Sequence, residues 1–126
     1  PAALDRFRFV GELASRFPEA LVGLDAEDAG LLHLEMDQFR KVTQEAIGRG
    51  DTDKVKDHLF FIDWAYANGD DEVKGAIRVS YLEHLDWQGP EGFLASKFLM
   101  SGLRRAIAEN EANLERGYRE SLEGEP

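Results

Sequence analysis

The stretch GDTDKVKDHLFFIDWAYANGDDEVKGAIRVSYLEHLDW, residues 50–87, decides the fold. It holds two apolar segments, and each follows a Gly-Asp pair whose acid is Asp51 or Asp70. An Asp directly ahead of a periodic apolar segment is a good N-cap, because its carboxylate accepts hydrogen bonds from the free N–H groups of the first turn. We therefore expect two consecutive helices, over residues 51–68 and 71–86.

The first of these helices is apolar on most of its circumference. At helical spacing Leu59 belongs to one apolar stripe, Phe60 and Trp64 belong to a second, and Phe61 partly fills a third. A helix that is apolar nearly all round belongs inside a fold, with neighbours on several sides. We therefore expect Phe60, Phe61, Trp64 and Tyr81 to be buried between neighbouring helices.

The second helix has one apolar face, made of Val73, Ala76, Ile77, Ser80, Tyr81 and His84. Its position on this face predicts that His84 is a hydrogen-bonded histidine of the core or of an interface. Taken alone, residues 77–82 would also suit a short strand, because Val, Ile and Tyr favour sheets. The capped start and the Gly-Pro break that follows favour a helix.

The remaining apolar periodicity predicts further helices over residues 4–17, from residue 26 or 31 to 48, over 93–100, and from 103 onward. The sequence thus predicts an all-α fold: either a compact bundle of about five helices or a short helical-repeat (HEAT-like) stack. We expect residues 1–122 to form a single domain and residues 123–126 a disordered tail.

Composition narrows the class of protein. The chain has 126 residues, no cysteine and a formal net charge of -10. The absence of cysteine is compatible with a reducing cytoplasm, where we place the protein. A surface this acidic repels nucleic acid and anionic membranes, so we expect neither as a partner. Its apolar runs are far shorter than the roughly 20 residues of a spanning helix.

No motif of an enzyme or of a metal site stands out. His33, His58 and His84 lack the spacing of the known helical metal motifs, and the chain has no Gly-x-Ser-x-Gly elbow. The glycines lie at helix ends and not in a phosphate-binding loop. We expect no cofactor, no metal and no enzymatic activity. A small carboxylate- or metal-dependent enzyme is the less favoured alternative.

The distribution of acidic residues is more informative. Residues 51–72 contain seven acidic residues against two lysines. Helix capping explains those at the helix starts, but it does not explain Asp57 or Asp63, and we expect Asp63 to pair with Lys56 or Arg78. The candidate partner-binding residues are Asp51, Asp53, Asp57, Asp70, Asp71, Glu72, Glu83 and Asp86. Whether they form one patch stays open, since the two helix starts lie at opposite ends of an antiparallel pair.

Two segments, NGDDEVKGAIRVSYLEHL and FLASKFLMSGLRRAI, carry a resemblance. With the Val-Ser-aromatic-Leu-Glu-x-Leu pattern at residues 79–85, they resemble a family of small all-helical bacterial proteins found among candidate immunity proteins of toxin systems. The resemblance implies a non-enzymatic domain that binds and neutralises a protein partner.

The charge leads to the same interpretation independently, because many toxins that attack nucleic acid have basic active sites. Our leading interpretation is an immunity-type inhibitor whose exposed carboxylates bind Lys or Arg of a basic toxin. The alternative is a structural or homo-oligomeric helical protein whose acidic surface keeps it in solution.

Overall fold

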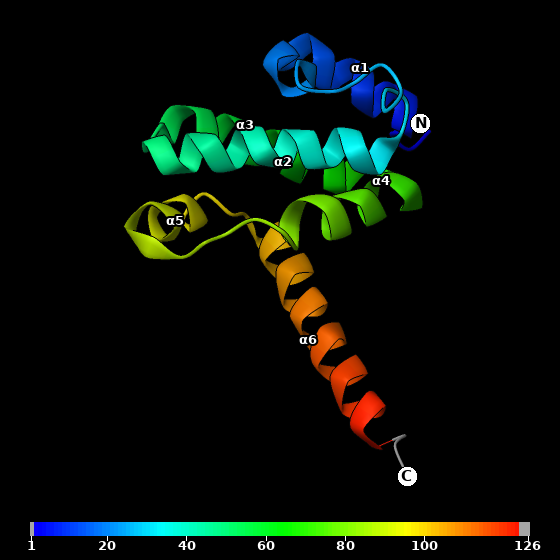
Figure 1. Cartoon of the computed structure of the whole chain (residues 1–126), viewed down its shortest axis with the longest axis vertical. Coiled ribbons are helices and arrows are strands. Elements are labelled where there is room, and N and C mark those ends of the chain that lie inside the picture. Colours follow the sequence, from blue (N-terminus) through cyan, green and yellow to red (C-terminus); the bar gives the residue numbers. More distant parts are fainter. Residues whose placement is uncertain (1, 124–126) are drawn as a thin grey trace.

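The computed structural model describes residues 2–123 and confirms an all-α fold (Figure 1). The described residues form six α-helices where about five were expected, together with a short 3-10 helix, η1, and a π-helix, η2. Their bounds are α1 Arg6–Arg16, η1 Pro18–Leu21, α2 Leu32–Arg49, α3 Thr52–Asn68, α4 Asp71–Ala76, η2 Ile77–Leu82, α5 Gly89–Ser96 and α6 Ser101–Glu123. Of the predicted tail, Glu123 is the last residue of α6, and residues 124–126 lie outside the described part.

Helix α2 is the central element of the body. It packs against α3 and η2, and it also contacts α1, η1, α4 and α5. Figure 1 shows α1 on one side of the α2–α3 pair and α4 with η2 on the other. Helix α6 then leaves this body and points away from it, so that the last turn of α6 lies far from α1.

The predicted helix starts are confirmed. The carboxylate of Asp51 accepts a hydrogen bond from the Lys54 N–H (3.3 Å), and that of Asp70 accepts one from the Val73 N–H (2.9 Å). Gly50 ends α2 in the left-handed conformation (φ 69°), which glycine adopts without the steric cost of a Cβ.

The N-terminal segment is fixed to the turn between α3 and α4. Leu4 forms an isolated parallel β-bridge with Gly69: its N–H donates to the Asn68 carbonyl (2.7 Å), and its own carbonyl accepts from the Asp70 N–H (2.9 Å). The Leu4 side chain is buried in the core. The start of the chain is therefore joined to a turn more than sixty residues away.

The core is rich in aromatic rings. Phe39 packs on Phe17 and Tyr81 with ring centroids 5.6 and 5.4 Å apart, and Phe61 joins them from α3. The predicted burial of Phe61 and Tyr81 is confirmed.

The expected burial of Phe60 between neighbouring helices was wrong, and that of Trp64 is only partial. Phe60 is 39% exposed and Trp64 is half-buried. Cations cover these two rings in place of neighbouring helices: the Lys56 ammonium lies 5.6 Å from the centre of the Phe60 ring, and the Arg16 guanidinium lies 5.2 Å from that of Trp64.

The expected single helix over residues 71–86 changes type at Ile77. There α4 continues as the π-helix η2, which ends with a hydrogen bond from the Glu83 N–H to the Arg78 carbonyl (3.1 Å). A π-helix bonds residue i to i+5, so its side chains drift away from the positions that α-helical spacing predicts. His84 is therefore exposed, and its expected place on the apolar face was wrong.

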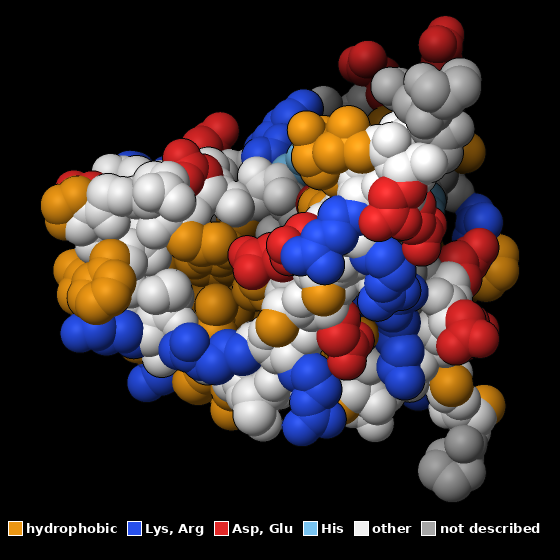
Figure 2. All heavy atoms as spheres, turned by 90° about the horizontal axis from the view of Figure 1, so that it is seen from below, with side chains coloured by type: hydrophobic (Ala, Val, Ile, Leu, Met, Phe, Trp, Pro, Cys, Tyr) orange, Lys and Arg blue, Asp and Glu red, His pale blue; other side chains and the backbone are white. Residues whose placement is uncertain are grey.

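Helix α5 is the least covered part of the body. Phe93, Leu94 and Met100 on and after this helix are each about half exposed or more. Seen from below, hydrophobic side chains are visible on the left of the molecule, where α5 lies (Figure 2). The predicted segment 93–100 begins earlier than expected, because Pro90 at the start of α5 is compatible with the first helical turn.

A polar cluster lies at the centre of the core. Thr43 from α2, His58 from α3 and Tyr81 from η2 are fully buried. The Thr43 hydroxyl donates to the Phe39 carbonyl (3.1 Å), so its oxygen must accept the other two bonds: from Tyr81 Oη (2.8 Å) and from His58 Nδ1 (2.9 Å). One hydroxyl thus links three helical segments.

This bonding pattern fixes the tautomer of His58. With the proton on Nδ1, the other ring nitrogen, Nε2, is buried and has no hydrogen-bond partner among the described residues. Phe17 and Phe39 pack against the ring, with centroids 4.7 Å away in each case. Burial, and secondarily the nearby Lys54, lower the pKa of His58 from 6.5 to about 4.

We expect the free energy of unfolding to decrease as the pH falls from about 6.5 to about 4, by up to about 3 kcal/mol from His58 alone. The unfolded chain binds a proton at His58 in this range, whereas the folded protein excludes it, so the lower pH favours unfolding. Urea unfolding of the wild type and of His58→Phe at a series of pH values measures this contribution. Equal pH dependence in both proteins would contradict it.

Candidate functional site

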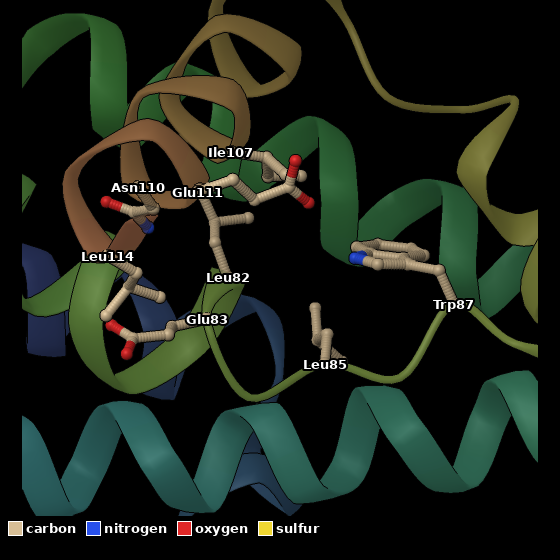
Figure 3. Close-up of a pocket in the computed structure, with 8 residues that line it drawn as sticks. All are labelled: Leu82, Glu83, Leu85, Trp87, Ile107, Asn110, Glu111 and Leu114. Atoms are coloured by element: carbon tan, nitrogen blue, oxygen red, sulfur yellow. The ribbon is translucent and has the colours of Figure 1, made fainter. Parts of the chain in front are cut away.

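A groove of about 120 Å³ opens where α6 leaves the body. One wall comes from the end of η2 and the loop that follows it, and the other wall comes from α6 (Figure 3). Its lining residues, which we call the α6 groove, are Leu82, Glu83, Leu85, Trp87, Ile107, Asn110, Glu111 and Leu114. Most of its lining surface is apolar, so the groove suits apolar side chains.

The polar groups of the α6 groove have distinct positions. The Trp87 Nε1–H is buried without a hydrogen-bond partner among the described residues, and Figure 3 shows the indole nitrogen on the side that faces the other lining residues. Glu83 and Glu111 are exposed and come from opposite walls. Asn110 donates to the Arg78 carbonyl (3.1 Å) and so holds α6 against η2. The groove therefore offers two carboxylates around an apolar centre, while the indole N–H stays buried.

The loop wall of the α6 groove is held rigidly. Gln44 of α2 forms two hydrogen bonds with the backbone of Asp86, one from the Asp86 N–H to Gln44 Oε1 (2.8 Å) and one from Gln44 Nε2 to the Asp86 carbonyl (3.3 Å). Beyond it, Gly92 of α5 lies directly against Trp87. A Cβ on Gly92 would lie 2.4 Å from the Trp87 carbonyl carbon, which is a steric clash, so this position requires glycine.

The sequence-predicted acidic residues do not form one patch. Three lie at the N-cap and in the first two turns of α3 (Asp51, Asp53, Asp57), and three lie at the start of α4 (Asp70, Asp71, Glu72). The 17 residues of α3 separate these groups by about 25 Å. Glu83 lines the α6 groove, and Asp86 lies in its loop. On the face shown in Figure 2, acidic and basic side chains alternate.

Several of these carboxylates have structural partners. Asp51 and Asp70 are N-caps, Glu72 lies 3.9 Å from Arg6, and Asp86 accepts from the Gln88 N–H (2.9 Å). Asp53, Asp57, Asp71 and Glu83 are exposed without an ion pair among the described residues. Of all eight, Glu83 alone lines the α6 groove.

The expected partner of Asp63 was wrong. Neither Lys56 nor Arg78 forms an ion pair with it among the described residues. Its Oδ1 lies instead beside the first turn of α6, 3.5 Å from where a Cβ on Gly102 would be. Burial raises the pKa of Asp63. The positive end of a helix dipole attracts a carboxylate, so Asp63 is placed to stabilise the start of α6.

The three histidines lie in different places. His33 bonds Ser80 Oγ through Nδ1 (2.7 Å), His58 is part of the core cluster, and His84 is exposed. Within residues 2–123, no three His, Asp or Glu side chains are grouped so that they could hold a metal ion. A polar cluster that includes a histidine does exist, but the Thr43–His58–Tyr81 set is closed to solvent and offers a substrate no access.

Sequence reasoning missed the residues that build the α6 groove, apart from Glu83. Trp87 stands just before the Gly-Pro break, and no functional signal in the sequence marks it. Ile107 belongs to the apolar periodicity from residue 103 onward, but spacing within one helix cannot show which segment faces it.

Comparison with known proteins assigns the chain to a family. Fold and site together define a small all-α domain with an acid-rimmed apolar groove. The chain belongs to the family "Domain of unknown function (DUF7674)", whose model matches residues 10–114. No curated protein and no solved structure matches the chain.

All eight residues of the α6 groove fall within the matched range, whereas the last part of α6 lies beyond it. The family description names no function, so the resemblance to immunity proteins stays a prediction, as does the cytoplasmic location. Over residues 2–123, no helix combines the length and the apolar character that crossing a membrane requires.

We expect Gly92→Ala to lower the free energy of unfolding by about 1–3 kcal/mol, because the new Cβ would meet the Trp87 backbone, which must move. The control is Gly75→Ala, where a Cβ meets nothing within 4 Å and should stabilise α4 by about 0.5–1 kcal/mol. Thermal and urea unfolding measure both. Equal effects of the two substitutions would show that the loop wall is not held as described.

We expect Asp70→Ala to cost about 1 kcal/mol of folding stability, because it removes the N-cap of α4. Asp71→Ala, one residue later, removes an exposed carboxylate without that bond and should cost far less. Comparison of their urea unfolding midpoints tests the assignment. If the two variants are equally stable, the Asp70 side chain does not act as a cap.

Proposed function

We propose that this protein is a non-enzymatic protein-binding module, and that the α6 groove receives a basic amphipathic segment of a protein partner. The observation that carries this proposal is the combination of an apolar centre and two exposed carboxylates on opposite walls. A segment with an apolar residue flanked by Lys or Arg would fill the centre and pair with Glu83 and Glu111.

The charge of the whole chain favours a basic partner. With a net charge of -10, the protein attracts a cationic surface over a distance and accelerates its association. The apolar centre then supplies most of the affinity, because rim carboxylates contribute little by themselves. In this scheme the dispersed acids at the starts of α3 and α4 steer the partner and do not contact it.

In its most specific form, the proposal is that the module is an immunity-type inhibitor of a toxin. The resemblance at residues 79–85 supports this form, since Leu82, Glu83 and Leu85 of that segment line the α6 groove. The segment that carries the resemblance therefore contributes three of the eight residues that line the groove. Occlusion of a basic toxin surface would need no catalytic group of the inhibitor.

A fluorescence experiment tests the groove directly. The chain has two tryptophans, so Trp64→Phe leaves Trp87 in the groove as the single reporter. We expect a synthetic amphipathic helix of Leu and Lys to shift and saturate Trp87 emission. The same helix with Glu in place of Lys should not bind.

Charge reversal then distinguishes the groove from the overall charge. Glu83→Lys with Glu111→Lys should weaken binding of the Lys peptide by about tenfold or more. Asp53→Lys with Asp71→Lys changes the net charge equally but lies away from the groove, and should weaken binding much less. Equal losses in both double variants would mean that binding is not localised, and the proposal would fail.

The immunity form is tested in cells. If a toxin gene lies beside the gene for this chain, co-expression should relieve the growth arrest that the toxin causes, and Glu83→Lys with Glu111→Lys should abolish the relief. Protection by the groove variant at wild-type protein levels would contradict the immunity form.

A further inference from the structure

We propose that a cleft beside the start of α1 binds a small organic phosphate monoester. The cleft has a volume of about 480 Å³ and is lined by the N-terminal segment, the first turn of α1, the end of α3 and α4. Figure 1 shows the start of α1 at the same end of the molecule as α4. The charged residues of the lining are Arg8 and Lys74, so we call it the Arg8–Lys74 cleft. It shares no residue with the α6 groove.

Small side chains leave this space open. The bridge between Leu4 and Gly69 holds the N-terminal segment beside the end of α3, where the two would otherwise be free to separate. Ala2, Ala3 and Ala67 then line the cleft with single methyl groups. A concave, partly apolar space of this volume is typical of a pocket for a small molecule.

Trp64 gives the cleft an aromatic wall. Its side chain is half-buried and belongs to the lining. The Arg16 guanidinium lies 5.2 Å from the centre of the Trp64 ring system, and Arg16 also pairs with Glu12 (3.2 Å). An apolar group of a ligand can therefore pack against the part of the indole that lines the cleft.

Two cations of the cleft have no acidic partner. Arg8 and Lys74 form no ion pair among the described residues, although the chain has 25 acidic residues against 15 lysines and arginines. No Asp or Glu lines the cleft, whereas the hollow beside Phe60 includes Asp57 and that beside Phe98 includes Glu91. The Arg8–Lys74 cleft is thus a positively charged site on an acidic protein.

The carboxylates close to the cleft in sequence have other partners. Asp5 and Asp70 accept hydrogen bonds from backbone N–H groups in the first turns of α1 and α4 (2.8 and 2.9 Å). Glu72 lies 3.9 Å from Arg6. These three carboxylates therefore do not neutralise the two cations of the cleft, which remain available to an anionic ligand.

The two positive charges select the charge of the ligand. A phosphate monoester carries a charge of about -1.5 to -2 at neutral pH and has three acceptor oxygens, whereas a carboxylate carries a single charge. The planar guanidinium of Arg8 can bind two of these oxygens, and the ammonium of Lys74 can bind the third. The alanines and Trp64 then contact the apolar part of the ester.

Titration with phenyl phosphate tests the site. The chain has two tryptophans, so Trp87→Phe leaves Trp64 as the single reporter in the cleft. We expect a saturable change in Trp64 emission with a dissociation constant of about 1 mM or lower. Calorimetric titration of the unsubstituted protein should give the same constant and does not depend on the folding of the variant. Absence of binding in the calorimetric titration would overturn the inference.

Two double variants with the same change in net charge distinguish the cleft from general attraction. Arg8→Gln with Lys74→Gln should weaken phenyl phosphate binding at least about tenfold, because it removes both cations of the cleft. Arg105→Gln with Lys56→Gln changes two exposed cations outside the cleft and should bind like the wild type. Equal dissociation constants for the two double variants would show that the ligand does not bind in the cleft.

Other anions test the assigned ligand class. Benzoate and inorganic phosphate should each bind at least about tenfold more weakly than phenyl phosphate, since the first has one charge and the second has no apolar part. Equally tight binding of either anion would contradict an organic phosphate monoester. A phosphotyrosine peptide that binds more tightly than phenyl phosphate would assign the cleft to a protein partner and overturn the choice of a small molecule.

This inference does not rest on the proposed function. Binding of the Lys peptide is followed through Trp87, and binding of phenyl phosphate is followed through Trp64. A protein that binds the peptide but not phenyl phosphate would overturn the phosphate site and leave partner binding supported. The opposite result would support the phosphate site and contradict partner binding at the α6 groove.

Discussion

The rest of the structure depends on the three hydrogen bonds made by the Thr43 hydroxyl. It donates to the carbonyl of its own helix and accepts from His58 of α3 and from Tyr81 of η2. A buried polar group costs little only when its partners are satisfied, so this cluster specifies how the three segments meet. The position of Tyr81 in turn sets the path of the π-helix, and the π-helix directs Leu82 into the groove.

The residues that stabilise the fold and the residues that line the groove lie in different parts of the molecule. Stability resides in the aromatic core and in the polar cluster inside it, none of which reaches solvent. The surface features lie where the body ends: a rigid loop wall, one bridging amide from Asn110, and a helix that continues into solvent. Surface residues at this end can therefore change with little effect on the core.

The sequence predicts this fold well wherever a local signal determines the structure. Asp51 and Asp70 mark helix starts because capping involves only neighbouring residues. Prediction failed where the structure depends on distant contacts. Phe60 is exposed because α3 lacks a neighbour on that side, and His84 left the apolar face because a π-turn precedes it.

The site was harder to predict than the fold for the same reason. The α6 groove joins residues from two segments that only the tertiary structure brings together, and Glu83 was the one predicted residue that lines it. The other predicted acids were found by counting charges, which cannot show that α3 separates them.

The β-bridge between Leu4 and Gly69 has a consequence for biosynthesis. Translation proceeds from the N-terminal side, so Leu4 leaves the ribosome before the turn at Gly69 to which it binds. Leu4 cannot form this bridge, and Phe9 cannot pack on Phe61 of α3, until the chain has been translated as far as the turn after α3. Until then, the apolar face of α1 in a nascent chain is available to chaperones.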